Sequence, residues 1–372
     1  MGKIIEFGSA SNPEYPRSLS DAIILRNIGT LKDGTDLNGK TLTDLINKLF
    51  VGSDTFKFLH ISDTHGVNVG IPVAKTMMEE NPELRFTIVT GDIRPSETMI
   101  ATMVLSGKFL TMLGNHDVND EQVTNIVATS NVITPVCADK VILGGNSGEG
   151  YWYQDYYTAR GKGIRFIAFD EYEQSSTNNA IGQQVAYSQA QMDWFINLLK
   201  NTPRDFFLVL CHHQGLASSR VAGYRNLFTS EHAPSSYEFL GGCTPELIPN
   251  IMDAYMGRGS FSGTFNCGAT SGSDTMTFDV DFSNTTPAKF LMHIGGHTHW
   301  DCVEYLPNHP EQLQVLIDRD GNNKYTYSDL TRSDFTYCIN QYTINMDTGD
   351  ILIERIGAKA TDGGRSRTSI NF

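Results

Sequence analysis

Short apolar runs recur along the chain, and several of them end at a turn that carries acidic residues or histidine. Runs of this length, rich in β-branched and aromatic residues, are typical of buried strands. We interpret as strands residues 56–61, 86–89, 109–113, 206–210 and 290–294. Because each run stops just before a polar turn, we expect those polar side chains to lie at strand ends.

Helical patterning separates the first three of these strands. Residues 71–80 and 97–105 have the apolar period of a helix, which indicates strand–helix–strand units. Residues 188–200 predict another helix, in which Ser188 and Gln191 form a capping box. Its apolar stripe, which we expect to face the core, comprises Met192, Phe195, Ile196 and Leu199.

Two pairs of runs predict hairpins. Residues 151–157 and 164–169 flank a glycine-containing turn, and residues 337–346 and 351–356 flank a second turn. We expect the later hairpin to close the second of two sheets. The pattern as a whole predicts an α/β fold, a sandwich of mixed sheets with outer helices.

Composition narrows the class of protein. The 372 residues contain no stretch of 18 apolar residues, the N-terminus has no hydrophobic signal region, and the mean hydropathy is −0.25. We therefore expect a soluble protein without a membrane span, cytoplasmic or associated with a virion. The formal net charge of −14, without a cluster of Lys and Arg, argues against a nucleic-acid-binding surface.

Five polar turns carry the candidate chemistry. Their carboxylates, imidazoles and one carboxamide form the ligand set of a site that holds two divalent cations. Cations held about 3.5–4 Å apart repel each other, so an anionic ligand must lie between them, and Asp92 is our candidate. In chain order the turns are Asp63-Thr64-His65, Gly91-Asp92, Gly114-Asn115-His116-Asp117, Cys211-His212-His213 and Gly296-His297-Thr298-His299.

These turns, in this order, resemble the pattern of the calcineurin-like metallophosphoesterases, D-x-H, G-D, G-N-H-[DE], H and G-H-x-H, over about residues 56–300. The resemblance implies a four-layer αββα sandwich with the site on loops at the strand C-terminal ends. It also implies two divalent transition-metal ions (Mn, Fe or Zn) and a phosphate-ester substrate attacked in line by a hydroxide between the metals. One ion would be held by Asp63, His65, Asp92 and His299, and the other by Asp92, Asn115, His212 and His297.

Three assignments have alternatives. The family pattern directs the first histidine after the fourth strand toward the metals, so we favour His212 over His213. His116 is the candidate that stabilises developing charge or protonates the leaving group, and Asp117 is expected to orient its imidazole. Arg94 is either a contact to a phosphate oxygen or a surface charge.

Two further segments, an insertion and an N-terminal arm, have alternative roles. Residues 215–288 form an insertion that is either a substrate wall or lid, or a small core of its own; the candidate lining residues are Arg220, Tyr224, Arg225, Tyr237, Phe239, Tyr255 and Arg258. A helix is expected over residues 244–256. We divide the chain into an N-terminal arm with a short amphipathic helix, residues 1–52, and a catalytic domain, residues 53–372.

The function predicted from these features is hydrolysis of phosphate esters, with a diester favoured. Residues 31–50 resemble a linker element of bacteriophage virion and tail proteins. The arm would then dock on a virion or on another copy of the chain, or pack on its own domain. The alternative function is therefore a structural or binding protein of a virion that uses the same fold.

Overall fold

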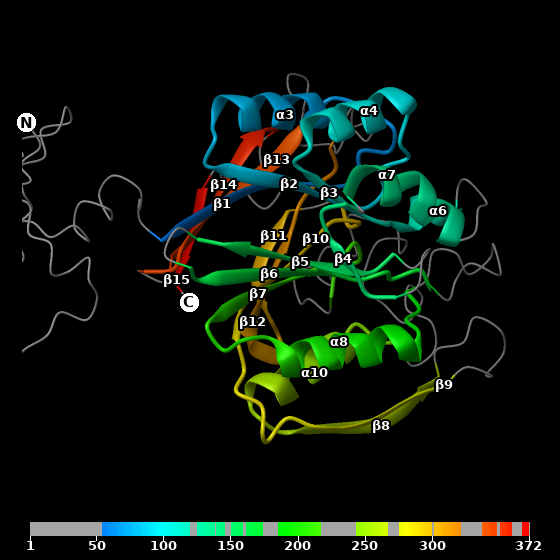
Figure 1. Ribbon diagram of the computed structural model, residues 1–372, viewed down its shortest axis with the longest axis vertical. Coiled ribbons are helices and arrows are strands. Elements are labelled where there is room, and N and C mark those ends of the chain that lie inside the picture. The colour runs from blue at the N-terminus through cyan, green and yellow to red at the C-terminus, as the bar shows by residue number, and fades with distance from the viewer. Residues whose placement is uncertain are drawn as a thin grey trace, which may run out of the picture.

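The computed structural model describes residues 54–119, 125–137, 139–145, 150–158, 161–173, 185–216, 243–266, 275–299, 301–320, 337–347, 350–358 and 367–371. Two large sheets pack face to face, and helices cover the outer face of each (Figure 1). The predicted α/β sandwich of four layers is confirmed. The predicted arm and amphipathic helix in residues 1–52, and the virion-like linker within them, lie outside the described residues.

The first sheet has the strand order β15-β14-β13-β1-β2-β3. Strands β1, β2 and β3 are parallel, whereas β13 pairs antiparallel with β1. The C-terminal hairpin therefore extends this first sheet, and the expectation that it closes the second sheet is wrong. The ring of Tyr342 stacks on Phe58 with centroids 4.5 Å apart, which places β13 beside β1. The bounds are β1 Thr55–Ile61, β2 Leu84–Thr90, β3 Phe109–Met112, β13 Cys338–Asn345, β14 Asp350–Gly357 and β15 Arg367–Asn371.

The second sheet has the order β11-β12-β10-β7-β6-β5-β4. Its centre is parallel, since β7 pairs in parallel with both β6 and β10, and β10 with β12. Parallel strands direct their C-terminal ends to one edge, which is where the polar turns lie. The bounds are β4 Ile142–Leu143, β5 Trp152–Tyr157, β6 Gly163–Ala168, β7 Phe206–Cys211, β10 Lys289–Gly295, β11 Cys302–Leu306 and β12 His309–Leu316.

The helices form the two outer layers (Figure 1). Those over the first sheet are α3 Gly70–Glu80, α4 Glu97–Ser106, α6 Asn125–Val132 and α7 Thr134–Cys137, and α5 Asn115–Asn119 is a single turn after β3. Helices α8, Gln189–Asn201, and α10, Leu247–Met256, lie over the second sheet. The apolar stripe predicted on α8 is buried.

The predicted capping box of α8 is half formed. The Ser188 hydroxyl accepts the backbone N–H of Gln191 at 3.1 Å, as expected. The Gln191 side chain does not return the bond to Ser188, whose N–H donates to Glu173 instead. Gln191 accepts from the nitrogen of Asp170 and donates to its carbonyl, both at 2.9 Å, and so ties α8 to the end of β6.

The described part of the insertion is core structure. Helix α10 begins at Leu247, later than the predicted residue 244, and packs with a two-stranded sheet of β8, Ser260–Asn266, and β9, Thr275–Asp281. Tyr255 is buried and its hydroxyl accepts the N–H of Ala288 at 2.6 Å. Residues 217–242, which hold the other candidate lining aromatics and arginines except Arg258, lie outside the described residues.

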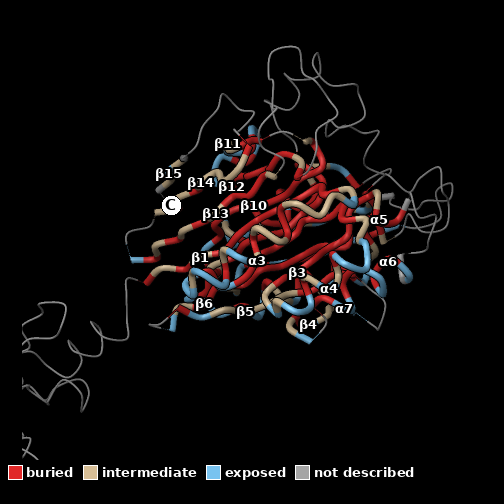
Figure 2. Tube along the Cα trace, turned by 90° about the horizontal axis from the view of Figure 1, so that it is seen from above, coloured by how far each residue is buried: buried red, intermediate tan, exposed pale blue. Residues whose placement is uncertain are grey.

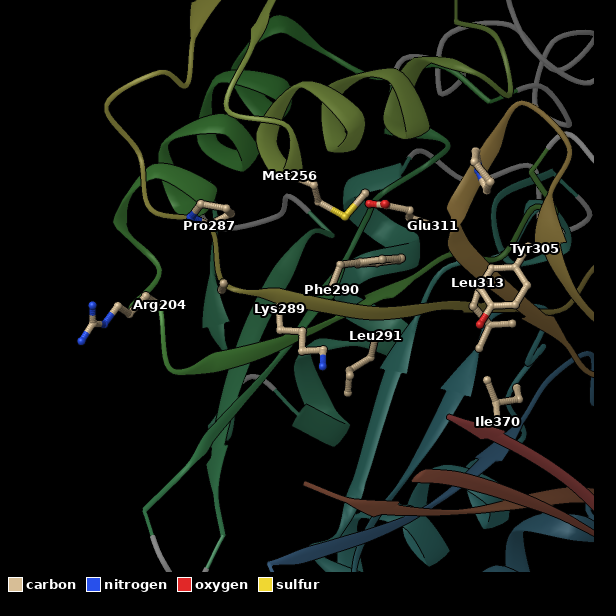
Figure 3. Close-up of a pocket in the computed structure, with 12 residues that line it drawn as sticks. Arg204, Met256, Pro287, Lys289, Phe290, Leu291, Tyr305, Glu311, Leu313 and Ile370 are labelled. Atoms are coloured by element: carbon tan, nitrogen blue, oxygen red, sulfur yellow. The ribbon is translucent and has the colours of Figure 1, made fainter. Parts of the chain in front are cut away.

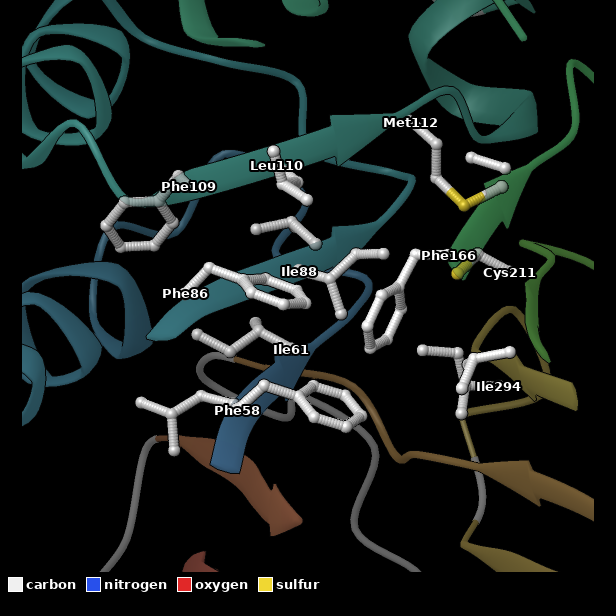
Figure 4. Close-up of a cluster of buried hydrophobic side chains, with 14 of the residues drawn as sticks. Phe58, Ile61, Phe86, Ile88, Phe109, Leu110, Met112, Phe166, Cys211 and Ile294 are labelled. Carbon is white, nitrogen blue, oxygen red and sulfur yellow. The ribbon is translucent and has the colours of Figure 1, made fainter. Parts of the chain in front are cut away.

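The main core lies between the two large sheets (Figures 2 and 4). The ring of Phe166 in β6 meets the rings of Phe58 and Phe86 edge-on, at centroid distances of 5.1 and 4.9 Å. Such aromatic pairs add roughly 0.5–1.5 kcal/mol each beyond their buried area. The two sheets thus form a fixed base for the loops at their shared edge.

Across the described residues, the helices are too short or too polar to cross a bilayer.

Candidate metal centre

The strand ends bring the predicted ligand turns together. Asp63 follows β1, Asp92 follows β2, and Asn115 follows β3 in the first sheet, while the histidine turns follow β7 and β10 in the second. Backbone hydrogen bonds join the first two loops: the nitrogens of Asp63 and His65 donate to the carbonyls of Gly91 and Asp92 at 3.1 and 2.9 Å. Each loop is therefore held by its neighbour.

The backbone of these loops is strained. Seven non-glycine residues in the described part of the chain have positive φ, and six of them lie here, with φ between 45° and 62°. This left-handed conformation costs an L-residue about 1–2 kcal/mol, and such strain concentrates at functional sites. The six are Asp63, His65, Asp92, Arg94, His297 and His299.

Glycines permit the loops to approach one another. A Cβ added to Gly91 would lie 2.6 Å from Nδ1 of His213, and one on Gly114 would overlap the carboxylate of Asp92. A Cβ on Gly296 would overlap Ser62 and Asp63. The glycine in each of these three ligand turns is thus required by packing.

The first corner of the site consists of Asp63, His65 and His299. Oδ1 of Asp63 lies 3.3 Å from Nε2 of His299 and 3.9 Å from Nε2 of His65. The two imidazole nitrogens are 3.1 Å apart. This carboxylate oxygen is buried and makes no hydrogen bond, whereas Oδ2 accepts the N–H of His297 at 2.9 Å. The free oxygen and two nitrogens converge as metal ligands do.

Asp92 spans the middle of the site. Its Oδ2 lies 3.7 Å from Nε2 of His65 and 3.9 Å from Nε2 of His116, and its Oδ1 lies 3.4 Å from Nε2 of His213. Oδ1 also accepts the N–H of His116 at 2.8 Å. The two oxygens face different histidines, which is the arrangement that a carboxylate between two cations needs.

The second corner consists of Asn115, His213 and His297. Oδ1 of Asn115 lies 3.1 Å from Nε2 of His213 and 3.1 Å from Nδ1 of His297. Potential ligand atoms of Asp92, His213 and His297 fall within 4.8 Å of one another. The donor set, one carboxylate, one amide oxygen and two imidazoles, suits a divalent transition metal.

The structure places His213, and not His212, beside Asn115 and His297. Along β7, Val209 and Cys211 face the core between the sheets, and Leu208 and Leu210 face the core under α8. Since side chains alternate along a strand, His213 continues the inner face and His212 the outer one. His212 stacks on Phe169 and contacts Glu171 and His293, away from the cluster.

Glu171 is a residue that the sequence reasoning missed. Its carboxylate is fully buried, and Oε2 accepts the N–H groups of His213 and Gln214, each at 2.7 Å. Its Oε1 lies 3.2 Å from Nδ1 of His212. The hydrogen bond to His212, against the cost of burial, keeps the pKa of Glu171 below its usual value. The carboxylate therefore fixes the backbone that presents the His213 imidazole.

Asp117, which is predicted to orient the His116 imidazole, bonds to backbone groups instead. Its oxygens accept backbone N–H groups of Ile93, Arg94 and Gly114, at 2.8–2.9 Å, so it ties the Asp92 loop to the Asn115 turn. It makes no bond to the His116 ring; Arg94 lies there, with its Nη2 3.4 Å from Nδ1 of His116. Arg94 therefore lies beside the candidate His116.

The electrostatics of the cluster favour a bound cation. Burial lowers the pKa of His65 to about 3 and that of His297 to about 4, so both rings are neutral at pH 7 and offer a lone pair. Burial also acts to lower the pKa of His213, but the charges of Asp92 and Asp63 raise it to about 10. The two buried carboxylates thus draw positive charge to the place where a metal would bind.

Of two cavities of similar size, one lies beside this cluster and the other away from it. One of about 600 Å³ is lined by Arg94, Asp117 and apolar side chains of α4, with Val132. Another of about 570 Å³ lies at the start of β10, around Lys289 to Leu291 (Figure 3). Because the ligand turn follows the end of β10, only the first cavity adjoins the candidate centre.

Comparison with family models finds no match, and comparison with curated protein sequences finds none either. Among solved structures, a dimetal phosphatase from Danio rerio matches 85% of this chain and 99% of its own at 10% identity, with a TM-score of 0.50. The chain is similar to it in fold.

Two other solved structures match more weakly. A phosphopantetheinyl hydrolase from Mycobacterium tuberculosis has a TM-score of 0.38 at 13% identity, covering 72% of this chain and 91% of its own. A predicted phosphoesterase from Streptococcus pneumoniae has 0.30 at 8%, covering 86% and 98%. With TM-scores below 0.5, neither carries an argument.

Proposed function

We propose that the protein is a metal-dependent hydrolase of phosphate esters that uses two divalent transition-metal ions. The observation that supports this most directly is the overlap of three clusters of ligand atoms, in which His65 and Asp92 each belong to two clusters. Two ions in these corners would neutralise the charge of a phosphoryl group and lower the pKa of an attacking water. The fold shared with a dimetal phosphatase agrees with this proposal.

The proposed ligands follow from the two corners and the carboxylate between them. Asp63, His65 and His299 would hold one ion, Asn115, His213 and His297 the other, and Asp92 would contact both. His213 takes the place expected for His212. The rigid sheet ends and the hydrogen bonds of Glu171 and Asp117 would keep these side chains in position before any ion binds.

His116 and Arg94 would act on the substrate. Nε2 of His116 lies 3.9 Å from the shared carboxylate Asp92, so it adjoins the reacting group without belonging to either corner. We propose that it donates a proton to the departing alkoxide, with Arg94 beside its other nitrogen. The alcohol part of the ester would lie in the cavity lined by Arg94 and α4.

The experiment is metal loading of the purified full-length chain, followed by metal analysis by mass spectrometry and turnover of 4-nitrophenyl phosphate and bis(4-nitrophenyl) phosphate. We expect two ions per chain, hydrolysis, and a higher rate on the diester. Asp92→Asn should abolish turnover and lower bound metal. The control is Asp205→Asn, an exposed carboxylate before β7, which should match the wild type. Wild-type protein that holds metal and cleaves neither ester would contradict the proposal.

A further inference from the structure

Arg319 lies between two of the ligand loops, although no sequence motif marks it. The nitrogen of Ile317 donates to the carbonyl of Gly295 at 3.0 Å, just before the turn that carries His297 and His299. The nitrogen of Asp320 donates to the carbonyl of Ser62 at 3.0 Å, just before Asp63. The backbone on both sides of Arg319 is therefore fixed against the first corner of the site.

The side chain of Arg319 is half-buried, and its Nε is buried without a hydrogen-bond partner among the described residues. Burying a guanidinium N–H without an acceptor is costly, so such groups normally have a partner. Arg165, for comparison, binds both carboxylate oxygens of Asp155 at 2.7 and 2.8 Å. An anionic ligand would supply the missing acceptor at Arg319.

Arg319 and Arg94 lie on different sides of the candidate centre. The neighbours of Arg319 bond to the backbone just before Asp63 and just before the turn of His297 and His299, whereas Arg94 lies beside His116. Two arginines flank the cluster from different loops.

We propose that Arg319 binds a non-bridging oxygen of the substrate phosphoryl group on the side of His65 and His299. This inference rests on the proposed phosphoesterase function. A guanidinium is suited to the task, because its planar N–H groups match two oxygens of a phosphate. The cationic guanidinium would repel metal ions. Its charge therefore favours the anionic substrate rather than the metals.

The test compares Arg319→Gln and Arg319→Lys with wild type, using inorganic phosphate as the probe. Calorimetry on the manganese-loaded full-length chain measures phosphate affinity, and a separate titration measures manganese affinity. We expect Arg319→Gln to bind phosphate roughly 10- to 100-fold more weakly, and Arg319→Lys to lie between it and wild type. Manganese affinity should be unchanged or higher. The matched control is Arg204→Gln, an exposed arginine before β7.

The outcomes separate this inference from the proposed function. Wild-type protein that binds manganese and cleaves esters, with Arg319→Gln binding phosphate within twofold of it, would overturn the role of Arg319 alone. A parallel loss of manganese and phosphate affinity would assign Arg319 a structural role and overturn the inference as well. Wild-type protein that binds no manganese and cleaves no ester would overturn both proposals.

Discussion

Oε2 of Glu171 accepts the backbone N–H of His213 at 2.7 Å, directly behind the candidate metal ligand. The same oxygen accepts the N–H of Gln214, so one buried carboxylate orients two consecutive peptide groups after β7. Groups that orient metal ligands through hydrogen bonds contribute to metal affinity, and loss of one typically weakens it about 10- to 100-fold. The geometry of the second corner therefore depends on a residue that touches no metal.

Glu171→Gln should weaken metal binding. An amide keeps one acceptor but turns an NH₂ group toward the backbone N–H groups or toward His212, so at least one hydrogen bond is lost. We expect manganese affinity to fall about 10- to 100-fold, measured by calorimetry. The control, Tyr187→Phe, removes only a hydroxyl 3.3 Å from Oε1 and leaves the carboxylate in place. A folded Glu171→Gln protein with wild-type manganese affinity would show that the backbone hydrogen bonds accepted by Glu171 have no influence on the site.

The adjacent histidines provide a second test. His213→Asn should reduce the bound metal, because the His213 ring lies in the corner with Asn115 and His297. His212→Asn should keep the metal and lower the free energy of unfolding by roughly 1–3 kcal/mol, because it removes buried contacts to Glu171 and His293. Metal analysis and urea denaturation of both variants decide the matter. Metal loss in His212→Asn, with metal retained in His213→Asn, would restore the original assignment.

The strands and helices near the site followed from the sequence because their apolar periods are strong and continuous. The prediction of His212 as a ligand ranked the first histidine over strand alternation. Val209 and Cys211 point inward. Because side chains alternate along a strand, this pattern in the sequence indicates that His213 points inward too. Three glycines in the ligand turns were also visible, although their close contacts with Asp92 and Asp63 were not.

Contacts between distant segments could not be read from the sequence. Glu171 follows β6 and meets the end of β7, 42 residues away, without a motif that marks it. Asp117 belongs to a motif, yet its bonds to the backbone of Ile93 and Arg94 depend on how two loops pack. The C-terminal hairpin was predicted, but its pairing with β1 spans most of the chain. Local sequence patterns predict helices, strands and candidate ligands better than they predict which distant residues contact one another.

His116→Asn should separate proton donation from metal binding. The variant should keep both ions, because His116 is proposed to act on the leaving group. Its rate should fall roughly 10²- to 10⁴-fold on an alkyl phosphate ester, whose alkoxide needs a proton. The loss should be much smaller on a 4-nitrophenyl ester, whose leaving group is already stable. Steady-state rates on the two esters check this, and equal losses would indicate charge stabilisation instead.

Asp117→Asn should destabilise the site without removing a ligand. The carboxylate accepts three backbone N–H groups, and an amide would leave at least one of them unpaired in a buried position. We expect the free energy of unfolding to fall by about 1–3 kcal/mol. Urea denaturation of the metal-free chain measures this, with the exposed Asp205→Asn as control. An unchanged unfolding midpoint would mean that these bonds contribute little to the loop.

His309 should make stability depend on pH at a place remote from the metal ligands. Its Nδ1 lies 2.6 Å from Asp253 and its Nε2 lies 2.5 Å from Glu246, so both ring nitrogens face carboxylates. Burial acts to lower the pKa of His309, but the hydrogen bonds to Asp253 and Glu246 raise it above 6.5. The imidazolium contribution to stability is therefore complete below pH 6.5 and is lost as pH rises through the raised pKa of the folded state.

Urea denaturation from pH 6 to pH 10 tests this linkage with His309→Gln. The loss of stability in the variant should be largest at pH 6 and should shrink as pH rises, since the wild-type imidazole then loses its charge. Asn308→Ala is the matched control, because it removes a neutral contact of 3.2 Å to the same Glu246. Its effect should not vary with pH through this pair. A constant difference between wild type and His309→Gln would show that the ring is neutral in the folded protein, and that the paired carboxylates do not hold its proton.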